Sequence, residues 1–294
     1  MADDAYELPF GSGTLSVSLP DCEVDLAVPD GGEAVDPRAA AEAALDEPHG
    51  PPIDEVVDAG DDVALVVTDV TRATPDEALV AGMLDRVPVD RDDVQIVLGL
   101  GLHRPMTDAE IRDGLGEYAD LAANHDPDAA VEVGEVDGVS VRVTPAVAEA
   151  DAVLATGMVE PHQYAGFSGG AKTVVVGAGA EPLIRYTHGP EMLAEPGVRL
   201  GRVDDNPFRE FLDRAGDLAG PDFCVNVTHG PAGVLGAAAG DPRAVVRDLS
   251  DTAREALSVA VSGEYDAVLG GVAAPKDANL YQTSRAATYV ILGA

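Results

Sequence analysis

The sequence predicts an α/β fold with a mostly parallel sheet flanked by helices, and three observations support this prediction. Apolar runs of strand length alternate with segments of helical length along the chain. Several of the apolar runs lead into polar loops that contain His, Arg or Asp. The chain has 294 residues, of which 46% are hydrophobic, so it can bury a large core and is long for a single domain.

The N-terminal part of the chain supplies the first elements of this pattern. Residues 14–20 and 22–29 alternate apolar and polar side chains, which predicts two short strands. Residues 36–48 have the pattern of a helix that a proline ends. An apolar run at 62–70 predicts a buried strand, and the loop after it leads into a helix expected over 75–86.

The same scheme repeats further along the chain. Residues 93–105 contain an apolar strand with a glycine-rich exit, and residues 107–116 form the pattern of a helix. Thr107 and Glu110 have the spacing of a capping box at the start of that helix. A further strand is expected over 150–159, and it also leads into a polar loop.

The C-terminal part predicts two strands joined by a turn over 221–241, an amphipathic helix over 241–261, and the opening of another strand at 265–273. Strands that alternate with helices form parallel sheets, and ligands then bind at the loops after the carboxyl ends of the strands. The polar loops of this chain occupy that position. We therefore expect the functional residues to lie at one edge of the sheet.

The charge balance limits the partners that we expect. The chain carries 53 acidic and 18 basic residues, a net charge of -35, and 16 of the basic residues are arginines. So acidic a chain repels nucleic acid and anionic lipid. Salt at molar concentration screens such repulsion within about 3 Å, so this composition indicates the cytoplasm of a halophilic organism.

The rest of the composition agrees with a cytoplasmic protein. The N-terminus lacks the basic and apolar regions of a signal peptide. No apolar run approaches the roughly 20 residues that a membrane-spanning helix needs. Cys22 and Cys224 lie far apart without C-x-x-C spacing, so we expect neither a disulfide framework nor a zinc knuckle.

Candidate acid/base and ligand residues lie in four loops, at 69–75, 99–105, 160–172 and 186–193. His103 and His162 follow strand exits, where an imidazole can act as an acid or a base near neutral pH. The alternative for each is a loop histidine that bonds to backbone groups. His188 is either a metal ligand or a neighbour of a helix cap.

Two further groups point to anion binding. Arg72, three residues after Asp69, is suited to clamp a carboxylate or a phosphate, although a local Asp–Arg pair explains the spacing nearly as well. The stretch GFSGGAKT at 166–173 resembles a phosphate loop but lacks its second glycine. Ser168, Gly169 and Gly170 could still present N–H groups to an anion, or simply form a tight turn. Lys172, one of only two lysines, could be an ion-pair partner or a covalent anchor.

Taken together, the loops resemble one family, the nickel-dependent lactate racemases and their α-hydroxy acid racemase and epimerase relatives. The resemblance runs from Asp69 to about Arg285. It consists of D-x-T-R-x-x-P, G-x-H-R-P-x-T, E-x-H-x-x-A-G-F-S-G-G-x-K and a following H-x-x-E. The third stretch is long and specific, and the order of all four matches the family.

The resemblance implies a cofactor, the nickel pincer nucleotide (Ni(II)-pyridinium-3-thioamide-5-thiocarboxylate mononucleotide), and partner proteins that synthesise it. It implies that Lys172 holds this cofactor covalently, that His188 ligates nickel, and that His103 and His162 are the acid/base groups. The implied cofactor contacts come from Asp69, Ser168, Gly169 and Gly170. The implied substrate contacts come from Arg72, Tyr281, Gln282 and Arg285.

The activity implied is racemisation or epimerisation of a 2-hydroxy acid, lactate or a related one, by hydride transfer to and from the cofactor. Arg285 stands where the family's best-known member has a lysine, which leaves the identity of the hydroxy acid open. One alternative is a truncated, non-catalytic relative that retains cofactor or hydroxy-acid binding. Another is a nucleotide hydrolase, which the incomplete phosphate loop disfavours.

The resemblance also suggests how the chain is divided. Residues 1–262 would form an N-terminal α/β domain like that of the lactate racemases. Residues 263–294 would be the beginning of a truncated C-terminal α/β domain, because the family pattern continues beyond the Y-Q-x-x-[KR] motif that ends at Arg285.

Overall fold

The computed structural model describes residues 5–261, 263–274, 276–277 and 280–293, without the side chains of residues 281, 282, 292 and 293. The chain divides into two compact units. One unit consists of residues 31–257, and the other combines residues 1–30 with residues 258–294. The division expected after residue 262 concerns the domains of the family and stays a prediction.

The larger unit is built on a sheet whose strands, within the described residues, follow the order β12-β11-β8-β3-β4-β5. All neighbouring pairs are parallel except β11 and β12, which form an antiparallel hairpin at one edge. The predicted α/β class with a mostly parallel sheet is therefore confirmed. The strand bounds are β3 (Val63–Thr68), β4 (Val94–Gly99), β5 (Ala122–Asn124), β8 (Ala152–Met158), β11 (Phe223–Gly230) and β12 (Gly233–Gly240).

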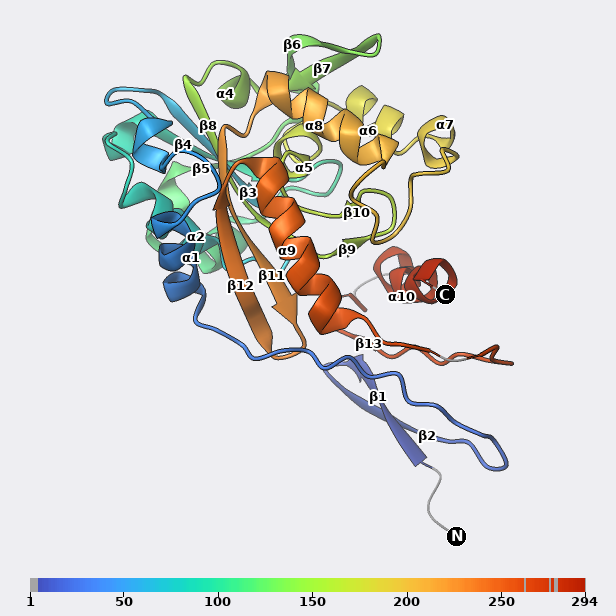
Figure 1. Ribbon diagram of the computed structural model, residues 1–294. Helices are drawn as coiled ribbons and strands as arrows, with labels where there is room; N and C mark the ends of the chain where they lie inside the picture. Colours follow the sequence, from blue (N-terminus) through green and yellow to red (C-terminus); the bar gives the residue numbers. More distant parts are fainter. Residues whose placement is uncertain (1–4, 262, 275, 278–279, 294) are drawn as a thin grey trace. The chain divides into compact units, whose positions relative to one another are not determined.

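Helices cover both faces of this sheet. Successive residues of a strand point to opposite faces, so a strand that is apolar throughout contributes side chains to the core on each side. Along β3, the side chains of Val63, Leu65 and Val67 join one core cluster, and those of Ala64 and Val66 join the other. The helices of the first cluster are α1 (Pro37–Asp46), α2 (Asp76–Leu84) and α3 (Asp108–Leu115). Those of the second are α5 (Lys172–Val175), α6 (Glu181–Thr187), α7 (Pro190–Leu193), α8 (Pro207–Ala219) and α9 (Pro242–Leu257) (Figure 1).

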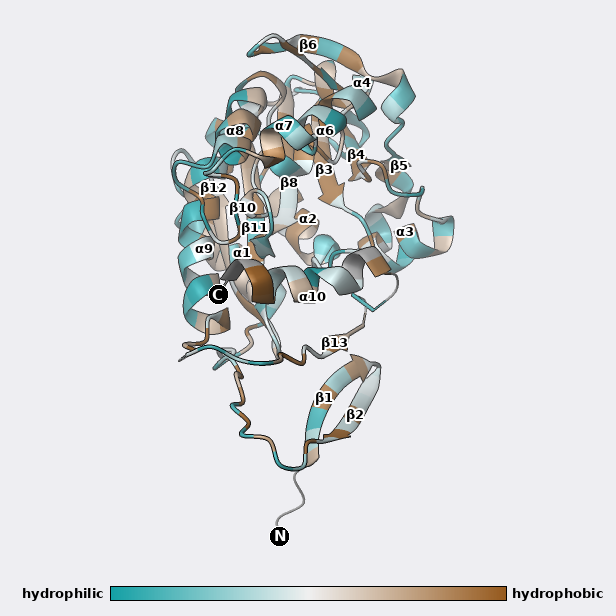
Figure 2. Ribbon diagram, turned by 90° about the vertical axis from the view of Figure 1, so that its right-hand side faces the viewer, coloured by the Kyte–Doolittle hydropathy of each residue, from teal (hydrophilic) through white to brown (hydrophobic). Residues whose placement is uncertain are grey.

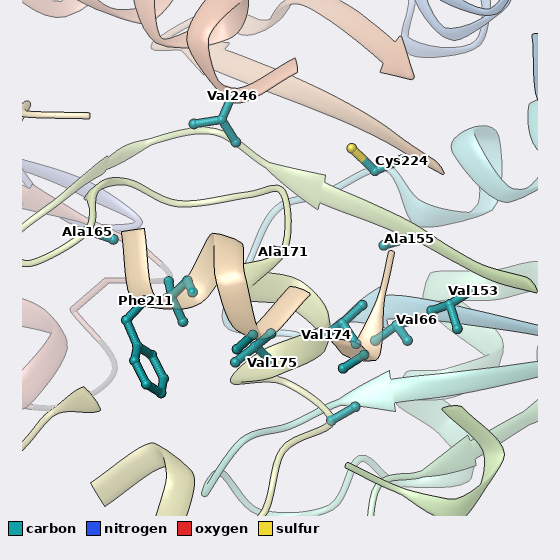
Figure 3. Packing of buried hydrophobic residues seen from close by; sticks show 14 of the residues in the cluster. Val66, Val153, Ala155, Ala165, Ala171, Val174, Val175, Phe211, Cys224 and Val246 are labelled. Carbon is teal, nitrogen blue, oxygen red and sulfur yellow. The ribbon is translucent and has the colours of Figure 1, made fainter. Parts of the chain in front are cut away.

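The second cluster anchors the helix that begins with Lys172. Val174 and Val175 of α5 are fully buried in it, together with Phe211 of α8 and Val66 of β3 (Figure 3). By residue hydropathy, the ribbon of the outer helix α9 is largely hydrophilic, whereas that of β3 is mostly hydrophobic (Figure 2). A four-residue helix is too short to be stable alone, so this packing fixes the position of α5.

Shorter elements complete the larger unit. They are the strands β6 (Val131–Val136), β7 (Val139–Val143), β9 (Pro161–His162) and β10 (Gly166–Phe167), the helix α4 (Pro145–Ala148), and 3-10 turns at Ile53–Glu55, Arg91–Asp93, Gly116–Leu121 and Pro127–Ala129. Antiparallel pairs join β6 to β7 and β9 to β10.

Local signals in the sequence explain where several helices begin. The side chain of Asp36 accepts a hydrogen bond from the Ala39 N–H at the start of α1. Thr107 and Glu110 form the predicted capping box of α3, with both reciprocal hydrogen bonds present. The predicted helices at 36–48, 75–86, 107–116 and 241–261 are all observed, with ends that differ by a few residues.

The smaller unit contains two corrections to the predicted strands. The antiparallel hairpin consists of β1 (Ala5–Gly11) and β2 (Gly13–Ser18), so the strand expected at 22–29 is not formed. The strand expected at 265–273 is reduced to β13 (Val272–Ala273), parallel to β1. Alternation of side chains alone does not make a strand, because the backbone needs a neighbouring strand as a partner. The last described element is the helix α10 (Leu280–Gly293).

The order of the strands creates a point at which the chain changes direction. From β3 the chain passes through α2 to β4 and through α3 to β5, on the face of the first cluster. It then returns to β8 on the other side of β3, and from β8 it passes through α5–α8 to β11 on the opposite face. The loops after β3 and β8 therefore leave neighbouring strands toward opposite faces, which opens a ligand-binding crevice in folds of this kind.

None of the helices in the described ranges is long and apolar enough to span a membrane.

Candidate active site

Asp69 and His103 form a hydrogen-bonded pair between the loops after β3 and β4. The distance from His103 Nδ1 to Asp69 Oδ2 is 2.5 Å. The other oxygen of Asp69 accepts hydrogen bonds from the backbone N–H and the hydroxyl of Thr71. Burial raises the pKa of Asp69, but the hydrogen bonds from His103 and Thr71 outweigh it and hold that pKa below its usual range.

This pairing fixes the tautomer of His103. An ionised carboxylate only accepts hydrogen bonds, so the ring proton lies on Nδ1 and Nε2 keeps its lone pair. Asp69 is 7% exposed, whereas the side chain of His103 is 42% exposed. The ring is therefore held by a buried partner and remains accessible, as a general base needs to be.

Arg72 and Glu160 connect the loops after β3 and β8. Arg72 Nη1 lies 3.9 Å from Glu160 Oε1, and the two side chains are 18% and 11% exposed. This contact crosses the point where the chain changes direction. Arg72 also donates to Thr71, the residue that holds Asp69. A guanidinium in this position can bind a carboxylate with two parallel hydrogen bonds.

His162 and His188 meet around Phe208. The ring centroids of His188 and Phe208 are 5.1 Å apart, and those of His162 and Phe208 are 6.3 Å apart. Tyr164 lies edge-on to both histidines, at 5.9 Å from His162 and 6.0 Å from His188. The loop after β8 and the end of α6 are thus brought together by one aromatic cluster.

His188 has the protonation state that a metal ligand requires. Its Nδ1 lies 3.0 Å from the carbonyl oxygen of Ile184 and 2.9 Å from the hydroxyl of Thr187. Burial lowers the pKa of His188 to about 4, and the positive charge of Lys172 contributes to this decrease. The ring is therefore neutral at pH 7, and with Nδ1–H donated to Ile184 the lone pair lies on Nε2.

Lys172 begins α5 and lies close enough to His188 for its charge to affect that histidine. The other end of the same segment is joined to the His103 loop, because the Gly101 N–H donates to the Gly177 carbonyl at 2.8 Å. A Cβ atom on Gly99 would lie 3.3 Å from the Gly177 Cα, so the glycines permit this close approach.

The residues Ser168, Gly169 and Gly170 shape the turn that leads to Lys172. The Ser168 hydroxyl donates to the Met158 carbonyl at 2.6 Å and accepts from the Glu160 N–H. The Gly170 N–H donates to Asn226 Oδ1 at 2.8 Å. These groups are occupied by protein partners, which favours the turn as their role. Their contact with the cofactor's phosphate stays a prediction.

Three buried polar residues near these loops were not singled out in the sequence. Arg209 is 3% exposed and donates to the carbonyls of Gly169, at 3.2 Å, and Phe167. Asn226 is fully buried, and its Nδ2 has no hydrogen-bond partner in the described part of the chain. Asp76 accepts from the hydroxyls of Thr68 and Thr156.

A sequence signal exists for only one of these three residues. Asn226 interrupts an apolar strand, and that interruption marks a buried polar group. Arg209 lies in α8 among several other charged residues, and Asp76 lies beside Glu77 in the first turn of α2, so only the packing decides which of these side chains is buried.

A cavity of about 260 Å³ borders the Asp69 side of the site. It is lined by the loop after β3 and by α3, including Asp69, Arg72, Thr74, Asp76 and Glu110. Within the described residues, no group of three or more His, Cys, Asp or Glu side chains could hold a metal ion by itself.

The remaining candidate residues belong to the smaller unit. Arg285 is 6% exposed in α10 and donates to the Tyr289 hydroxyl at 2.9 Å. The side chains of Tyr281 and Gln282 lie outside the described part of the structure. The substrate contacts expected of these three residues stay predictions.

Comparison with known proteins identifies similar chains. The chain is 27% identical over 264 residues to a lactate racemase of Lactiplantibacillus plantarum, covering 85% of this chain and 62% of the relative. It is also 27% identical over 237 residues to a lactate racemase of Thermoanaerobacterium thermosaccharolyticum, covering 75% of this chain and 55% of the relative. The chain thus spans less than two thirds of the length of either curated relative.

The fold has a counterpart among solved structures. The lactate racemase apoprotein from Thermoanaerobacterium thermosaccharolyticum matches 87% of this chain and 63% of its own, with a TM-score of 0.78 and 24% identity. A model of the lactate racemase N-terminal domain matches residues 10–201, which is more than half of the chain. The chain therefore belongs to the family defined by the lactate racemase N-terminal domain.

Proposed function

We propose that the protein is a racemase or epimerase of a 2-hydroxy acid that works with a nickel pincer nucleotide. The observation that carries this proposal is the hydrogen-bonded Asp69–His103 pair between the loops after β3 and β4. The contact of Arg72 with Glu160 and the neutral His188 close to Lys172 support it. The relatives named lactate racemase support the class of substrate. Cofactor-synthesis proteins would be the partners.

The residues present fit the proposed cofactor. His188 is neutral, and its Nδ1 is held by a backbone carbonyl. A histidine that ligates a metal through one ring nitrogen commonly donates the N–H of the other to such a partner, so Nε2 of His188 can ligate nickel. Lys172 would hold the cofactor covalently.

The difficulty of the reaction explains why a cofactor is needed. The C–H bond next to a hydroxyl group is a poor acid, so simple removal of that proton is slow. When bound, the cofactor supplies a two-electron acceptor that takes hydride from this carbon and returns it to either face. The protein then has to hold the substrate and move the hydroxyl proton.

The site residues divide these tasks. His103 and His162 act as the acid/base groups that flank the substrate. Arg72 binds the substrate carboxylate, with Arg285, Tyr281 and Gln282 as further substrate contacts. The hydrogen bond from His103 supports a role for Asp69 in orienting that histidine and offsetting the charge of the imidazolium, as well as in the expected cofactor contact.

The proposal is tested with protein produced together with the cofactor-synthesis enzymes. Intact mass and metal analysis should find an adduct and nickel on the wild-type protein and neither on Lys172→Ala. Chiral chromatography should detect interconversion of D- and L-hydroxy acids. An adduct that persists in the lysine variant would remove the anchor role. A loaded protein that interconverts no hydroxy acid would support the alternative, a relative that binds without catalysis.

A further inference from the structure

One peptide group in the turn before Lys172 is held at both of its polar ends. The carbonyl of Gly169 accepts a hydrogen bond from Arg209 Nη1 at 3.2 Å, and the N–H of Gly170 donates to Asn226 Oδ1 at 2.8 Å. This carbonyl and this N–H belong to the same trans peptide unit, so they point in opposite directions. Arg209 of α8 and Asn226 of β11 therefore hold the unit from opposite sides.

A turn made of two glycines needs such support. Gly169 and Gly170 have φ angles of +81° and +59°, a region that glycine enters freely. Without neighbours, the peptide group between them would be free to rotate. Rotation by half a turn would direct the Gly170 N–H at the guanidinium, and two donors do not pair. Asn226 carries both an acceptor and a donor, whereas Arg209 only donates, so Arg209 selects one orientation of the peptide group.

Both side chains are buried, and their hydrogen bonds in the described part of the chain go to this turn. Arg209 is 3% exposed, and its other Nη group donates to the carbonyl of Phe167. The carboxylate of Asp213 lies 3.8 Å from Arg209 Nη1, which is too far for a hydrogen bond. Asn226 is fully buried, and its contact with the turn is made by Oδ1. Burial of such groups is costly unless they are hydrogen-bonded, so holding the turn accounts for their position.

The residue after the turn connects it rigidly to Lys172. Ala171 is 4% exposed and lies in the second core cluster (Figure 3). A Cβ atom on Gly216 of α8 would lie only 2.6 Å from the Cβ of Ala171, so the chain here is closely packed on α8. Lys172 follows directly as the first residue of α5.

We propose that Arg209 and Asn226 are positioning residues for Lys172. By holding the peptide group between Gly169 and Gly170 in one orientation, they fix the turn that presents the lysine side chain to the site. The inference rests on the proposed function, because it takes Lys172 as the anchor of the cofactor. It assigns a role to two residues that contact the turn and not the reacting atoms.

The first test needs neither cofactor nor substrate. NMR measures hydrogen exchange at the Gly170 N–H relative to that of Val66 in the central strand β3, which corrects for a change in overall stability. Asn226→Leu removes the acceptor and should accelerate exchange at Gly170 at least about tenfold. Arg209→Met should also accelerate it, although Asn226 still accepts from this N–H. Unchanged exchange in Arg209→Met would overturn the inference that both residues hold one peptide group.

Three further variants separate positioning from general support. Thr228→Val removes another buried hydrogen bond of β11, from the Thr228 hydroxyl to the Val159 carbonyl at 2.8 Å, and should leave exchange at Gly170 unchanged. Asn226→Asp keeps the acceptor, and Nδ2 has no partner among the described residues to lose, so exchange should stay near the wild-type rate.

The double variant Asn226→Leu, Arg209→Met measures the coupling of the two residues. It should accelerate exchange at Gly170 by less than the product of the single effects, because both side chains act on the same peptide group. An effect equal to that product would show independent roles and contradict the proposal.

The second test measures the adduct on Lys172 in protein produced together with the cofactor-synthesis enzymes. Intact mass should show that Asn226→Leu lowers the fraction with adduct at least about tenfold, whereas Thr228→Val and Asn226→Asp stay within about twofold of wild type. A wild-type level of adduct on Asn226→Leu would overturn the positioning role. If wild type carries no adduct but shows the expected exchange rates, the anchor role of Lys172 and the proposed function fail, and the hold on the peptide group stands.

Discussion

The buried carboxyl group of Asp76 should make the protein less stable as the pH rises from about 5 to about 8. Asp76 is 8% exposed at the start of α2, and its carboxyl group accepts from the hydroxyls of Thr68 and Thr156. Burial raises its pKa from 3.8 to about 7, although both hydrogen bonds act in the opposite direction. The N-terminus of α2 favours the anion by only about 0.5 kcal/mol, which is small beside this shift.

The sign of the effect follows from proton binding. Between the unfolded pKa of 3.8 and the folded pKa of about 7, the folded protein binds more protons than the unfolded chain. The contribution of Asp76 to stability is therefore fully present below the unfolded pKa and is lost as the pH rises through the folded pKa. At about 1.4 kcal/mol per pKa unit, about 2.5 kcal/mol should be lost between about pH 5 and about pH 8.

The assay is urea denaturation of the wild-type protein and of Asp76→Asn in about 1 M KCl, which screens the surface charges. Asparagine keeps the shape and does not titrate, so its stability relative to wild type should increase by about 2.5 kcal/mol from about pH 5 to about pH 8. Asp113→Asn removes an exposed carboxylate that lines the same cavity and serves as the control for net charge. Parallel pH profiles of the wild-type protein and Asp76→Asn would refute the reasoning.

Three further substitutions test the support of the site and of the fold. Arg209→Met removes a charged donor from two loop carbonyls and should lower the free energy of unfolding by about 3 kcal/mol, measured by urea denaturation; an unchanged midpoint would contradict this role. Gly169→Ala places a Cβ 2.6 Å from Asn226 Oδ1 at a φ of +81°, so it should destabilise by at least about 2 kcal/mol. Its control is Gly138→Ala, with a φ of +79° and open space, which should cost only about 1 kcal/mol, and equal losses would argue against the clash. Thr107→Ala removes a capping box and should lower the melting temperature by about 3 °C in calorimetry, whereas no change would mean that solvent replaces the cap.

Much of the fold could be predicted because its signals are local. The buried strands from β3 to β12 that were expected are apolar runs bounded by glycine or polar residues, and the helices begin at caps such as Asp36 and Thr107. The two N-terminal strands of the smaller unit lie at other residues than predicted, because the pairing of strands is not a local signal. Which of several alternating segments pairs with which depends on partners that the segment itself does not contain.

The candidate site shows the same division. The sequence by itself determined which residue types follow the strands: Asp69 and Arg72 after β3, His103 after β4, and His162 after β8. It also determined the family, because the motifs keep their order along the chain.

Only the tertiary structure decided which of these residues meet. Asp69 contacts His103 across 34 positions, Asp76 contacts Thr156 across 80, and Gly170 contacts Asn226 across 56. Each contact exists because β3 lies between β4 and β8, with β11 beside β8. Burial, tautomers and shifted pKa values arise from such neighbours, and a neighbour distant in sequence leaves no mark on the local pattern of residues.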